Sequence, residues 1–251
     1  MFESLSAAPP DPILGLSEAF KTDERPAKIN LTIGVYQDAT GKTPVLECVK
    51  TAEERLLADE ASKSYLGMGG LPAFADATRD LVLGDLVDSD RVAVAQTPGG
   101  TGALRVAADF LAGTSPNANV WCSNPTWPNH RAIFPAAGLN LVDFRYLADD
   151  RRNLDFDGLI DQLERSLKPG DVVVLHGCCH NPTGVDPSAE QWEAIAELTA
   201  QRGAMPLLDF AYQGFGDGLE ADRVGLKAIA SQHEEFIVCS SYSKNFGLYS
   251  E

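Results

Sequence analysis

The sequence predicts an α/β fold in which a mostly parallel β-sheet is sandwiched by helices. From residue 92 onwards, short runs of apolar and β-branched residues alternate with longer segments of helical periodicity. The predicted strands are apolar throughout, which is typical of parallel strands covered on both faces. No internal repeat or low-complexity segment interrupts this alternation.

An arm and two helices are expected before residue 92. Residues 1–14 contain Pro9, Pro10 and Pro12, which disfavour a stable helix, so we expect an extended arm of the kind that often packs on a partner subunit. The next elements expected are a strand at 29–33, a glycine-punctuated turn at 34–41, a helix at 47–61, a flexible loop at 65–72 and a helix from 72 to about 83.

Strands and helices then alternate to the end of the chain. The strands are expected at 92–96, 120–122, 141–146, 172–176, 206–210 and 236–240. The helices are expected at 101–112, 129–137, 157–167, 188–202 and 224–232. We expect Asp157 to cap its helix, Ser188 and Gln191 to form a capping box, and Gly203 to end the helix that precedes it.

Charge and cysteine usage narrow the function classes. Acidic residues outnumber basic residues by 36 to 20, and the resulting net charge of −16 argues against nucleic acid or an anionic membrane as a partner. The first residues have neither the basic start nor the apolar core of a signal peptide, and no run of about 20 apolar residues could span a bilayer. The five cysteines are odd in number and lie mostly in apolar runs, which predicts buried free thiols in a reducing cytoplasm.

Lys244 is the first candidate for chemistry. It follows the predicted strand 236–240 and lies between Ser243 and Asn245. A lysine just past a buried strand is poorly hydrated, which favours the neutral amine, a nucleophile toward carbonyls. A surface lysine in a loop is the alternative.

Further ligand-binding groups follow other strands, because ligands of open α/β sheets bind beyond the carboxyl ends of the strands. Residues 98–102 (Pro-Gly-Gly-Thr-Gly) lead directly into a helix, so their amides could bind a phosphate. A tight strand-to-helix turn would look the same. Trp127 could stack on a planar ring or belong to the core.

Asp209 ends another apolar strand. A buried carboxylate is costly without a cationic partner, which a protonated pyridine nitrogen could supply. The alternative is a carboxylate that caps a helix or ties a loop. His176, Cys178 and His180 alternate in a way that could suit a metal, but the spacing matches no usual zinc motif, and we expect no metal site.

Together these groups meet the needs of pyridoxal 5'-phosphate. Its aldehyde needs a lysine, its phosphate a glycine-rich helix start, and its pyridine nitrogen a carboxylate. Its ring needs a stacking face, and its phenolic oxygen needs donors such as Asn181 and Tyr212. We therefore predict a site for this cofactor at the carboxyl ends of the strands.

Five motifs lie in order along the chain. They are 96–105 (Gln-Thr-Pro-Gly-Gly-Thr-Gly-Ala-Leu-Arg), 124–130 (Asn-Pro-Thr-Trp-Pro-Asn-His), 176–184 (His-Gly-Cys-Cys-His-Asn-Pro-Thr-Gly), 209–215 (Asp-Phe-Ala-Tyr-Gln-Gly-Phe) and 240–249 (Ser-Ser-Tyr-Ser-Lys-Asn-Phe-Gly-Leu-Tyr). In this order they resemble the aspartate and aromatic aminotransferase family, the class I aminotransferases of fold type I. The resemblance implies an N-terminal arm at 1–14, the N-terminal part of a small domain at 15–46, and a cofactor-binding large domain at 47–251.

The resemblance also implies roles for single residues. The catalytic set would be Lys244, which binds the aldehyde as an imine and shuttles a proton, Asp209, which pairs with the pyridinium nitrogen, and Tyr212. For the cofactor ring, the resemblance implies that His130 supports Asp209, that Asn181 and Tyr212 bind the phenolic oxygen, and that Trp127 stacks on the ring. Around the phosphate it implies Gly100, Thr101, Ser241 and Ser243. Tyr65 would reach the phosphate of the neighbouring subunit of a homodimer. Gly34, Trp127 and Asn181 would border the substrate carboxylate. The Asn124–Pro125 and Asn181–Pro182 bonds would be cis.

The activity implied is transamination between an amino acid and 2-oxoglutarate. The sequence Asn-Phe-Gly after Lys244 resembles the aspartate members more than the aromatic ones. Alternatives are an aromatic aminotransferase, another fold type I enzyme such as a lyase, or a non-catalytic binding domain of the same fold. The family pattern continues past Glu251 with arginines for the phosphate and the substrate carboxylates. The chain therefore resembles a C-terminally shortened member, and we expect the 251 residues alone to be inactive.

Overall fold

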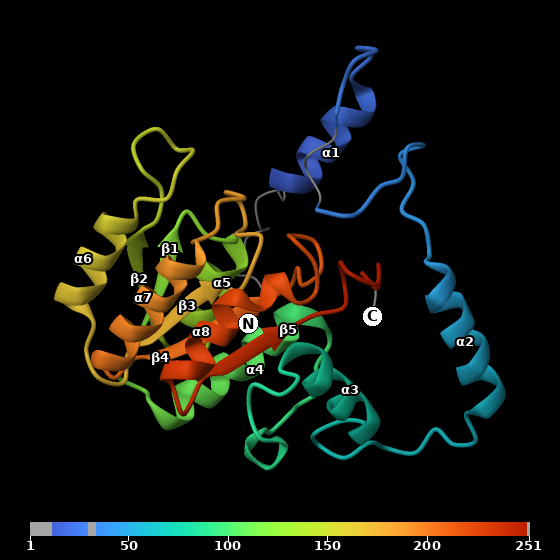
Figure 1. The fold of residues 1–251 in the computed structure, drawn as a ribbon. Helices are drawn as coiled ribbons and strands as arrows, with labels where there is room; N and C mark the ends of the chain where they lie inside the picture. The colour runs from blue at the N-terminus through green and yellow to red at the C-terminus, as the bar shows by residue number, and fades with distance from the viewer. Residues whose placement is uncertain (1–11, 30–33, 250–251) are drawn as a thin grey trace, which may run out of the picture. The chain divides into compact units, whose positions relative to one another are not determined.

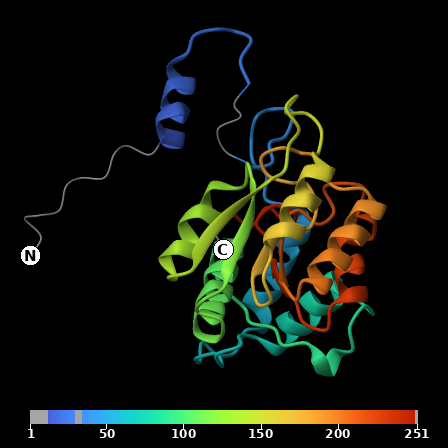
Figure 2. The ribbon, with the colours of Figure 1, turned by 90° about the vertical axis from the view of Figure 1, so that its left-hand side faces the viewer.

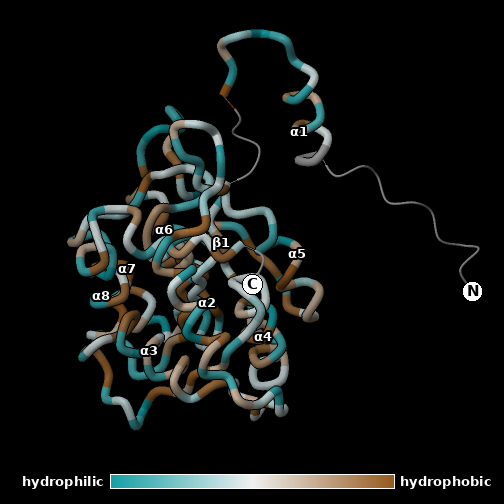
Figure 3. The backbone as a smooth tube through the Cα atoms, turned by 90° about the vertical axis from the view of Figure 1, so that its right-hand side faces the viewer, coloured by the Kyte–Doolittle hydropathy of each residue, from teal (hydrophilic) through white to brown (hydrophobic). Residues whose placement is uncertain are grey.

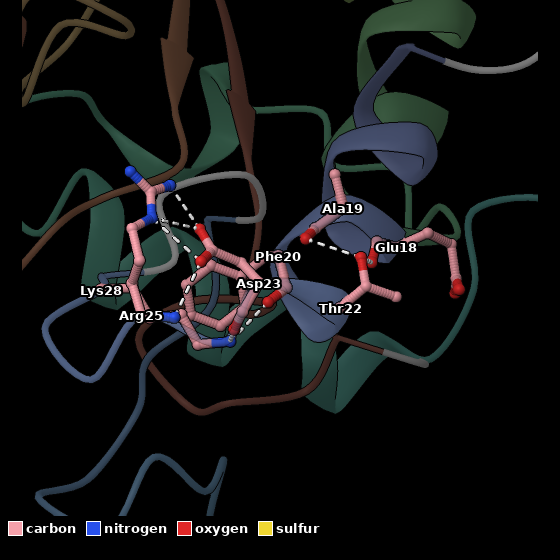
Figure 4. Close-up of polar contacts among 7 residues, drawn as sticks. All are labelled: Glu18, Ala19, Phe20, Thr22, Asp23, Arg25 and Lys28. Carbon is pink, nitrogen blue, oxygen red and sulfur yellow. Dashed lines mark hydrogen bonds and ion pairs between the residues drawn. The ribbon is translucent and has the colours of Figure 1, made fainter.

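The computed structural model describes residues 12–29 and 34–249, and the chain divides into two compact units between Val45 and Leu46. The first unit contains helix α1 (Pro12–Thr22) (Figure 1). At the end of α1, Lys28 Nζ donates to the carbonyl oxygens of Phe20, at 2.6 Å, and Asp23, and it lies 4.4 Å from the centroid of the Phe20 ring (Figure 4). Because the last carbonyls of a helix have no partner within it, Lys28 stabilises this end of α1.

The start of α1 corrects one prediction. The helix begins at Pro12, so the expectation that residues 1–14 hold no helix is wrong for residues 12–14. Proline is tolerated at the first helical position because the N–H that it lacks would have no acceptor within the helix. Residues 1–11 of the predicted arm, and residues 30–33 of the predicted strand, lie outside the described residues.

The second unit is built on a parallel sheet with the strand order β2-β1-β3-β4-β5. The strands are β1 (Asn119–Asn124), β2 (Asn140–Arg145), β3 (Val172–His176), β4 (Met205–Phe210) and β5 (Ile237–Ser240). Every residue of the central strand β3 is buried. The register places His176 of β3 opposite Asp209 of β4, so the polar residues that end these strands lie side by side.

Helices cover both faces of this sheet, and Figure 2 shows the two helical layers on either side of the strands. They are α4 (Gly99–Thr114) and α5 (Pro128–Ala136) on one face, and α6 (Phe156–Ser166), α7 (Ala189–Gln201) and α8 (Val224–Gln232) on the other. Alternate residues of β3 join the two cores: Val174 packs in the cluster of Leu104 from α4, and Val173 in that of Ile195 from α7. The predicted α/β fold with a parallel sheet between helices is confirmed.

Two further helices, α2 (Glu47–Asp59) and α3 (Pro72–Val82), precede the sheet in sequence and lie close to the predicted ranges. Only Val49 is buried in α2, whereas α4 buries Leu104, Ala107, Ala108 and Leu111. Figure 3 shows that both hydrophilic and hydrophobic residues occur in these helices.

The predicted helix ends are partly confirmed. Ser188 and Gln191 form the capping box expected for α7. The cap expected at Asp157 is wrong: Asp155 caps α6, where its carboxylate accepts a hydrogen bond from the N–H of Gly158. Both aspartates suit a helix start, and the residue two positions earlier is the one that can reach a free N–H.

The strand expected at 92–96 is also absent. This segment forms no ladder with any described strand. Val92, Val94 and Gln96 are half-buried, whereas Ala93 and Ala95 are exposed, so the segment keeps the two-residue alternation of a strand. The segment thus has the apolar alternation of a strand, but a strand also needs a hydrogen-bonded neighbour.

The described residues bear on two expectations from composition, the absence of a membrane-spanning helix and the state of the cysteines. No helix among them is long and apolar enough to cross a membrane. All five cysteines are free thiols; Cys122, Cys178 and Cys239 are buried and Cys179 is half-buried. Cys48 is exposed, so the expectation of buried thiols is wrong for this residue, which lies near the start of the solvent-exposed helix α2.

Candidate active site

The centre of the candidate site is a buried carboxylate–imidazole pair at the carboxyl end of β4. His130 Nε2 lies 2.9 Å from Oδ2 of Asp209. The His130 side chain is fully buried, and 10% of the Asp209 side chain is exposed. His130 comes from α5, which begins with Pro128 at its first turn and carries the imidazole inward from the loop that follows β1.

A chain of hydrogen bonds fixes the orientation of this pair. Nδ1 of His176 accepts from the backbone N–H of Asn181 at 3.1 Å, so the proton of a neutral His176 is on Nε2. That Nε2 lies 3.1 Å from the Thr126 hydroxyl, which in turn lies 2.8 Å from Nδ1 of His130. The assignment that satisfies every group has Thr126 donating to His130, which leaves the Nε2–H of His130 to donate to Asp209.

Burial keeps the neighbouring imidazoles neutral. Desolvation, together with a smaller effect of the nearby His180, lowers the pKa of His176 from 6.5 to about 3. Desolvation likewise lowers the pKa of His180 to about 4. His180 stacks on Tyr146 with ring centroids 3.9 Å apart and on His176 at 4.1 Å, so the rings form one packed column behind the loop that follows β3.

Asn181, Tyr212 and Lys244 converge from three different loops. Nδ2 of Asn181 donates to the Tyr212 hydroxyl at 3.3 Å, and Lys244 Nζ lies 5.1 Å from the centroid of the Tyr212 ring. Burial raises the pKa of Tyr212, the hydrogen bond from Asn181 opposes this, and the charge of Asp209 adds to the rise. Tyr212 therefore contacts both Asn181 and Lys244 and feels the charge of Asp209.

The start of α4 lies beside the loop that follows β5. Its N-cap residue, Pro98, makes no side-chain cap, so the first amides of the helix are left for another acceptor. A Cβ at Gly100 would lie 3.2 Å from Cβ of Ser241, a tight contact that would require the Ser241 side chain to shift by a few tenths of an ångström. Ser241 in turn donates to the Ser243 hydroxyl at 2.9 Å.

The remaining predicted residues are placed as follows. Trp127 is half-buried and makes an edge contact with His130, with ring centroids 5.5 Å apart, so it is not a fully buried core tryptophan. Tyr65 is fully exposed in the loop that follows α2. Gly34 belongs to the first unit. The Asn124–Pro125 and Asn181–Pro182 bonds are cis, as the resemblance implied.

Sequence reasoning missed the roles of Thr126 and His176. The sequence pattern groups His176 and His180 with Cys178 as residues that could bind a metal ion. In the structure Nε2 of His176 lies 3.1 Å from the Thr126 hydroxyl, and Nε2 of His180 lies 2.8 Å from the Ser123 hydroxyl. Among the residues that the structure describes, no group of three His, Cys, Asp or Glu side chains is arranged to hold a metal ion.

Known proteins resemble this chain in sequence. The family model "Aminotransferase class I and II" matches residues 26–251. The chain is 57% identical to the aspartate aminotransferase of Escherichia coli (strain K12) over 254 residues, which cover all of this chain and 64% of that protein. The chain belongs to the class I and II aminotransferases. It is also 48% identical to an aromatic-amino-acid aminotransferase of Pseudomonas aeruginosa, covering 99% of this chain and 62% of that protein.

A solved structure extends the likeness to the fold of this aminotransferase chain. The aromatic-amino-acid aminotransferase of Burkholderia pseudomallei, covalently bound to pyridoxal phosphate, superposes with a TM-score of 0.93 at 43% identity. The match covers all of this chain and 63% of that structure. The chain thus spans about 64% of the length of the E. coli relative. Class I and II aminotransferases depend on pyridoxal phosphate.

Proposed function

We propose that this aminotransferase chain binds pyridoxal phosphate and takes part in transamination. The observation that carries the proposal is the Asp209–His130 pair, 2.9 Å apart at the carboxyl end of β4, together with Lys244, whose Nζ lies 5.1 Å from the centroid of the Tyr212 ring. When bound, the cofactor supplies an electron sink for the negative charge that develops at the substrate Cα.

The residues present fit this cofactor. Asp209 accepts one hydrogen bond among the described residues, which leaves acceptor capacity for a protonated ring nitrogen. The uncapped start of α4, including Gly100 and Thr101, together with Ser241 and Ser243, supports a phosphate position. Trp127 beside His130 supports a stacking face for the ring.

Each residue then has a physical task. Lys244 would bond covalently to the cofactor and carry a proton to and from the substrate Cα. Asp209 would hold the positive charge of the ring nitrogen, and His130 would orient Asp209. Asn181 and Tyr212 would bind the phenolic oxygen, with Asn181 and Trp127 also bordering the substrate carboxylate.

We propose aspartate and 2-oxoglutarate as the substrates. The higher identity to an aspartate aminotransferase, 57% against 48% for the aromatic relative, favours aspartate. Aromatic amino acids are the second candidate, because an aromatic aminotransferase superposes with a TM-score of 0.93. Gly34 remains predicted to border the substrate, and the division into arm, small domain and large domain remains a prediction.

A homodimer is part of the proposal. The segment 56–71 exposes six large apolar side chains, and Leu57, Tyr65 and Met68 are 86%, 105% and 105% exposed. Such a surface favours burial against a second copy, with Tyr65 reaching the neighbouring phosphate site. The free thiols support the cytoplasm as the compartment.

Covalent labelling tests the proposed role of Lys244. The chain is incubated with one equivalent of pyridoxal phosphate, reduced with borohydride, digested and mapped by mass spectrometry. We expect the label on Lys244, its loss in Lys244→Ala, and its retention in Lys168→Ala, a matched change of an exposed lysine. Labelling of a different lysine, or equal labelling in Lys244→Ala, would show that the assignment is wrong.

A further inference from the structure

The turn that carries Asn181 is held by side chains. It follows β3 and includes the cis Asn181–Pro182 bond. The backbone N–H groups of the three successive residues 179–181 each donate to a side chain. The N–H of Asn181 donates to Nδ1 of His176, which belongs to the chain of hydrogen bonds behind Asp209. The other two N–H groups have a different acceptor.

That acceptor is Asp186. The backbone nitrogen of Cys179 lies 2.6 Å from its Oδ2, and the backbone nitrogen of His180 lies 2.8 Å from its Oδ1. Both carboxylate oxygens thus bind consecutive amides, and the negative charge of the carboxylate strengthens both bonds. Asp186 is exposed, so these two bonds, and not burial, are what it contributes to the chain.

The conformation of Cys179 explains why the turn needs this support. Its φ is +51°, in the left-handed region, which is unfavourable for a residue with a Cβ. Among the described residues other than glycine, only Arg151 shares a positive φ with it. A change of φ at Cys179 would rotate its N–H relative to that of His180, and the two could no longer share one carboxylate. The bonds to Asp186 therefore oppose relaxation of the turn.

The loop also holds the other side of Asn181. The N–H of Gly184 donates to the carbonyl oxygen of His180 at 2.7 Å, and Nδ1 of His180 lies 2.8 Å from the Thr183 hydroxyl. Asn181 thus lies between two fixed points. From there its Nδ2 donates to the Tyr212 hydroxyl at 3.3 Å, so the direction of this side chain depends on the turn before it.

We propose that Asp186 is a positioning residue: its carboxylate holds Cys179 in the left-handed conformation and so directs the Asn181 side chain at Tyr212 and at the phenolic oxygen of the cofactor. The part that concerns the cofactor rests on the proposed function, in which Asn181 binds that oxygen. The part that concerns Tyr212 does not, because that hydrogen bond involves residues of this chain alone. Asp186 acts only through the turn.

The amide signal of Asn181 tests the first part without cofactor. The chain is labelled with ¹⁵N at asparagine, and the side-chain signal of Asn181 is assigned by its loss in Asn181→Asp. Asp186→Asn keeps the size of the side chain but replaces one acceptor oxygen by an NH₂ group, which cannot accept from a backbone N–H. We expect the Asn181 signal to move toward the position of free asparagine.

A second change and a matched control make this test specific. Adding Cys179→Gly to Asp186→Asn should return the signal by about half or more, because glycine adopts the left-handed conformation without a steric cost. Asp149→Asn is the control, since the Asp149 side chain is 98% exposed and pairs with Arg145 instead of the turn. It should leave the signal in place.

The visible absorbance of bound pyridoxal phosphate tests the second part. A hydrogen bond to the ionised phenolic oxygen favours that form, so Asp186→Asn should move the pH midpoint of the absorbance change upward by about 0.5 or more, and Asp149→Asn should not. If the midpoint stays while the Asn181 signal moves, Asn181 does not bind the phenolic oxygen and the cofactor part is wrong. If the unchanged chain binds no cofactor, the proposed function fails, and the amide signal still decides the role of Asp186. The proposal is overturned if Asp186→Asn leaves the Asn181 signal unchanged, if Asp149→Asn moves it equally, or if adding Cys179→Gly restores nothing.

Discussion

Two buried aspartates at opposite ends of the sheet differ in how the chain satisfies them. Asp171, just before β3, accepts hydrogen bonds from the N–H and Nδ2 of Asn119, from Nε1 of Trp121 and from the N–H of Lys168, at 2.9–3.2 Å. Asp209 lies near the carboxyl end of β4. Among the hydrogen bonds of the described residues, its side chain accepts only the one from Nε2 of His130. The first carboxylate is saturated by the chain, and the second keeps capacity for a donor from outside.

This difference is the one that we expect between a structural carboxylate and the ligand-binding carboxylate that we propose at Asp209. A buried carboxylate costs free energy unless its oxygens are hydrogen-bonded. At Asp171 the chain supplies all the donors, so the residue ties β1 to the start of β3. At Asp209 the chain supplies an oriented imidazole, and we propose that a cation takes the acceptor capacity that remains. Exposure alone would not distinguish the two, because 3% of Asp171 and 10% of the Asp209 side chain are exposed.

The largest expected effect is on turnover. In a chimera that completes this chain with the remaining part of the E. coli relative, Asp209→Ala should lower the rate of aspartate transamination by about 10³-fold or more, because the charge of the ring nitrogen loses its partner. Asp209→Glu should retain more activity than the alanine variant. Oxaloacetate formation measures both, and near-normal turnover in Asp209→Ala would make Asp209 a structural residue like Asp171.

The complementary change should act on stability. Asp171→Ala leaves the buried N–H groups of Trp121 and Asn119 without their acceptor, and we expect the free energy of unfolding to fall by about 2–4 kcal/mol. Urea denaturation of the 251-residue chain measures this, with Asp209→Ala as the matched variant that should lose less. If both variants unfold at the same urea concentration, the distinction between the two carboxylates fails.

Lowering the pH should reduce the stability of the folded chain through His176 and His180, the stacked histidines near Asp209. The folded-state pKa values of His176 and His180, about 3 and about 4, lie below the unfolded value of 6.5. Above pH 6.5 both imidazoles are neutral in the folded and in the unfolded state, so they do not reduce the free energy of unfolding. Between pH 6.5 and about 3 the unfolded state binds protons that the folded state excludes, so stability falls as pH falls. We expect the melting temperature to drop by several degrees from pH 7.5 to 5, and by less in His176→Gln; equal drops would contradict this account.

The smallest effect is expected from the hydrogen bonds that join His176, Thr126 and His130 and so orient the partner of Asp209. Thr126→Val removes the hydroxyl that joins His176 to His130 and should lower turnover of the chimera by about tenfold, since the buried hydrogen bond that orients His130, worth about 1.4 kcal/mol, is lost. Thr126→Ser should restore most of the activity. Ser123→Ala, which removes the hydroxyl beside His180 instead, is the control and should have less effect on turnover.

The sequence was sufficient for features that depend on local pattern. The all-apolar run of β3 predicted a buried parallel strand, and Ser188 with Gln191 predicted the start of α7, because both signals lie within a few residues. Asp209 and Lys244 could be recognised because each follows an apolar run at a strand end. The resemblance added His130, which no periodicity would have paired with Asp209.

Features that need a distant partner could not be predicted. Thr126 and His176 are 50 residues apart, and their hydrogen bond follows from the register of β1 and β3 rather than from spacing. The segment 92–96 has the pattern of a strand, but no described strand lies beside it. Asp155 caps α6 instead of Asp157 because one carboxylate reaches a free N–H and the other does not.

The most direct test of the central claim is the protonation of the cofactor's ring nitrogen. Pyridoxal phosphate labelled with ¹⁵N at this position is bound to the chain, to Asp171→Asn and to Asp209→Ala, and the nitrogen shift is measured by NMR at pH 7.5. If Asp209 alone keeps an acceptor open, the nitrogen is protonated in the first two and deprotonated in Asp209→Ala. A shift that is the same in all three proteins would show that Asp209 does not hold the ring nitrogen.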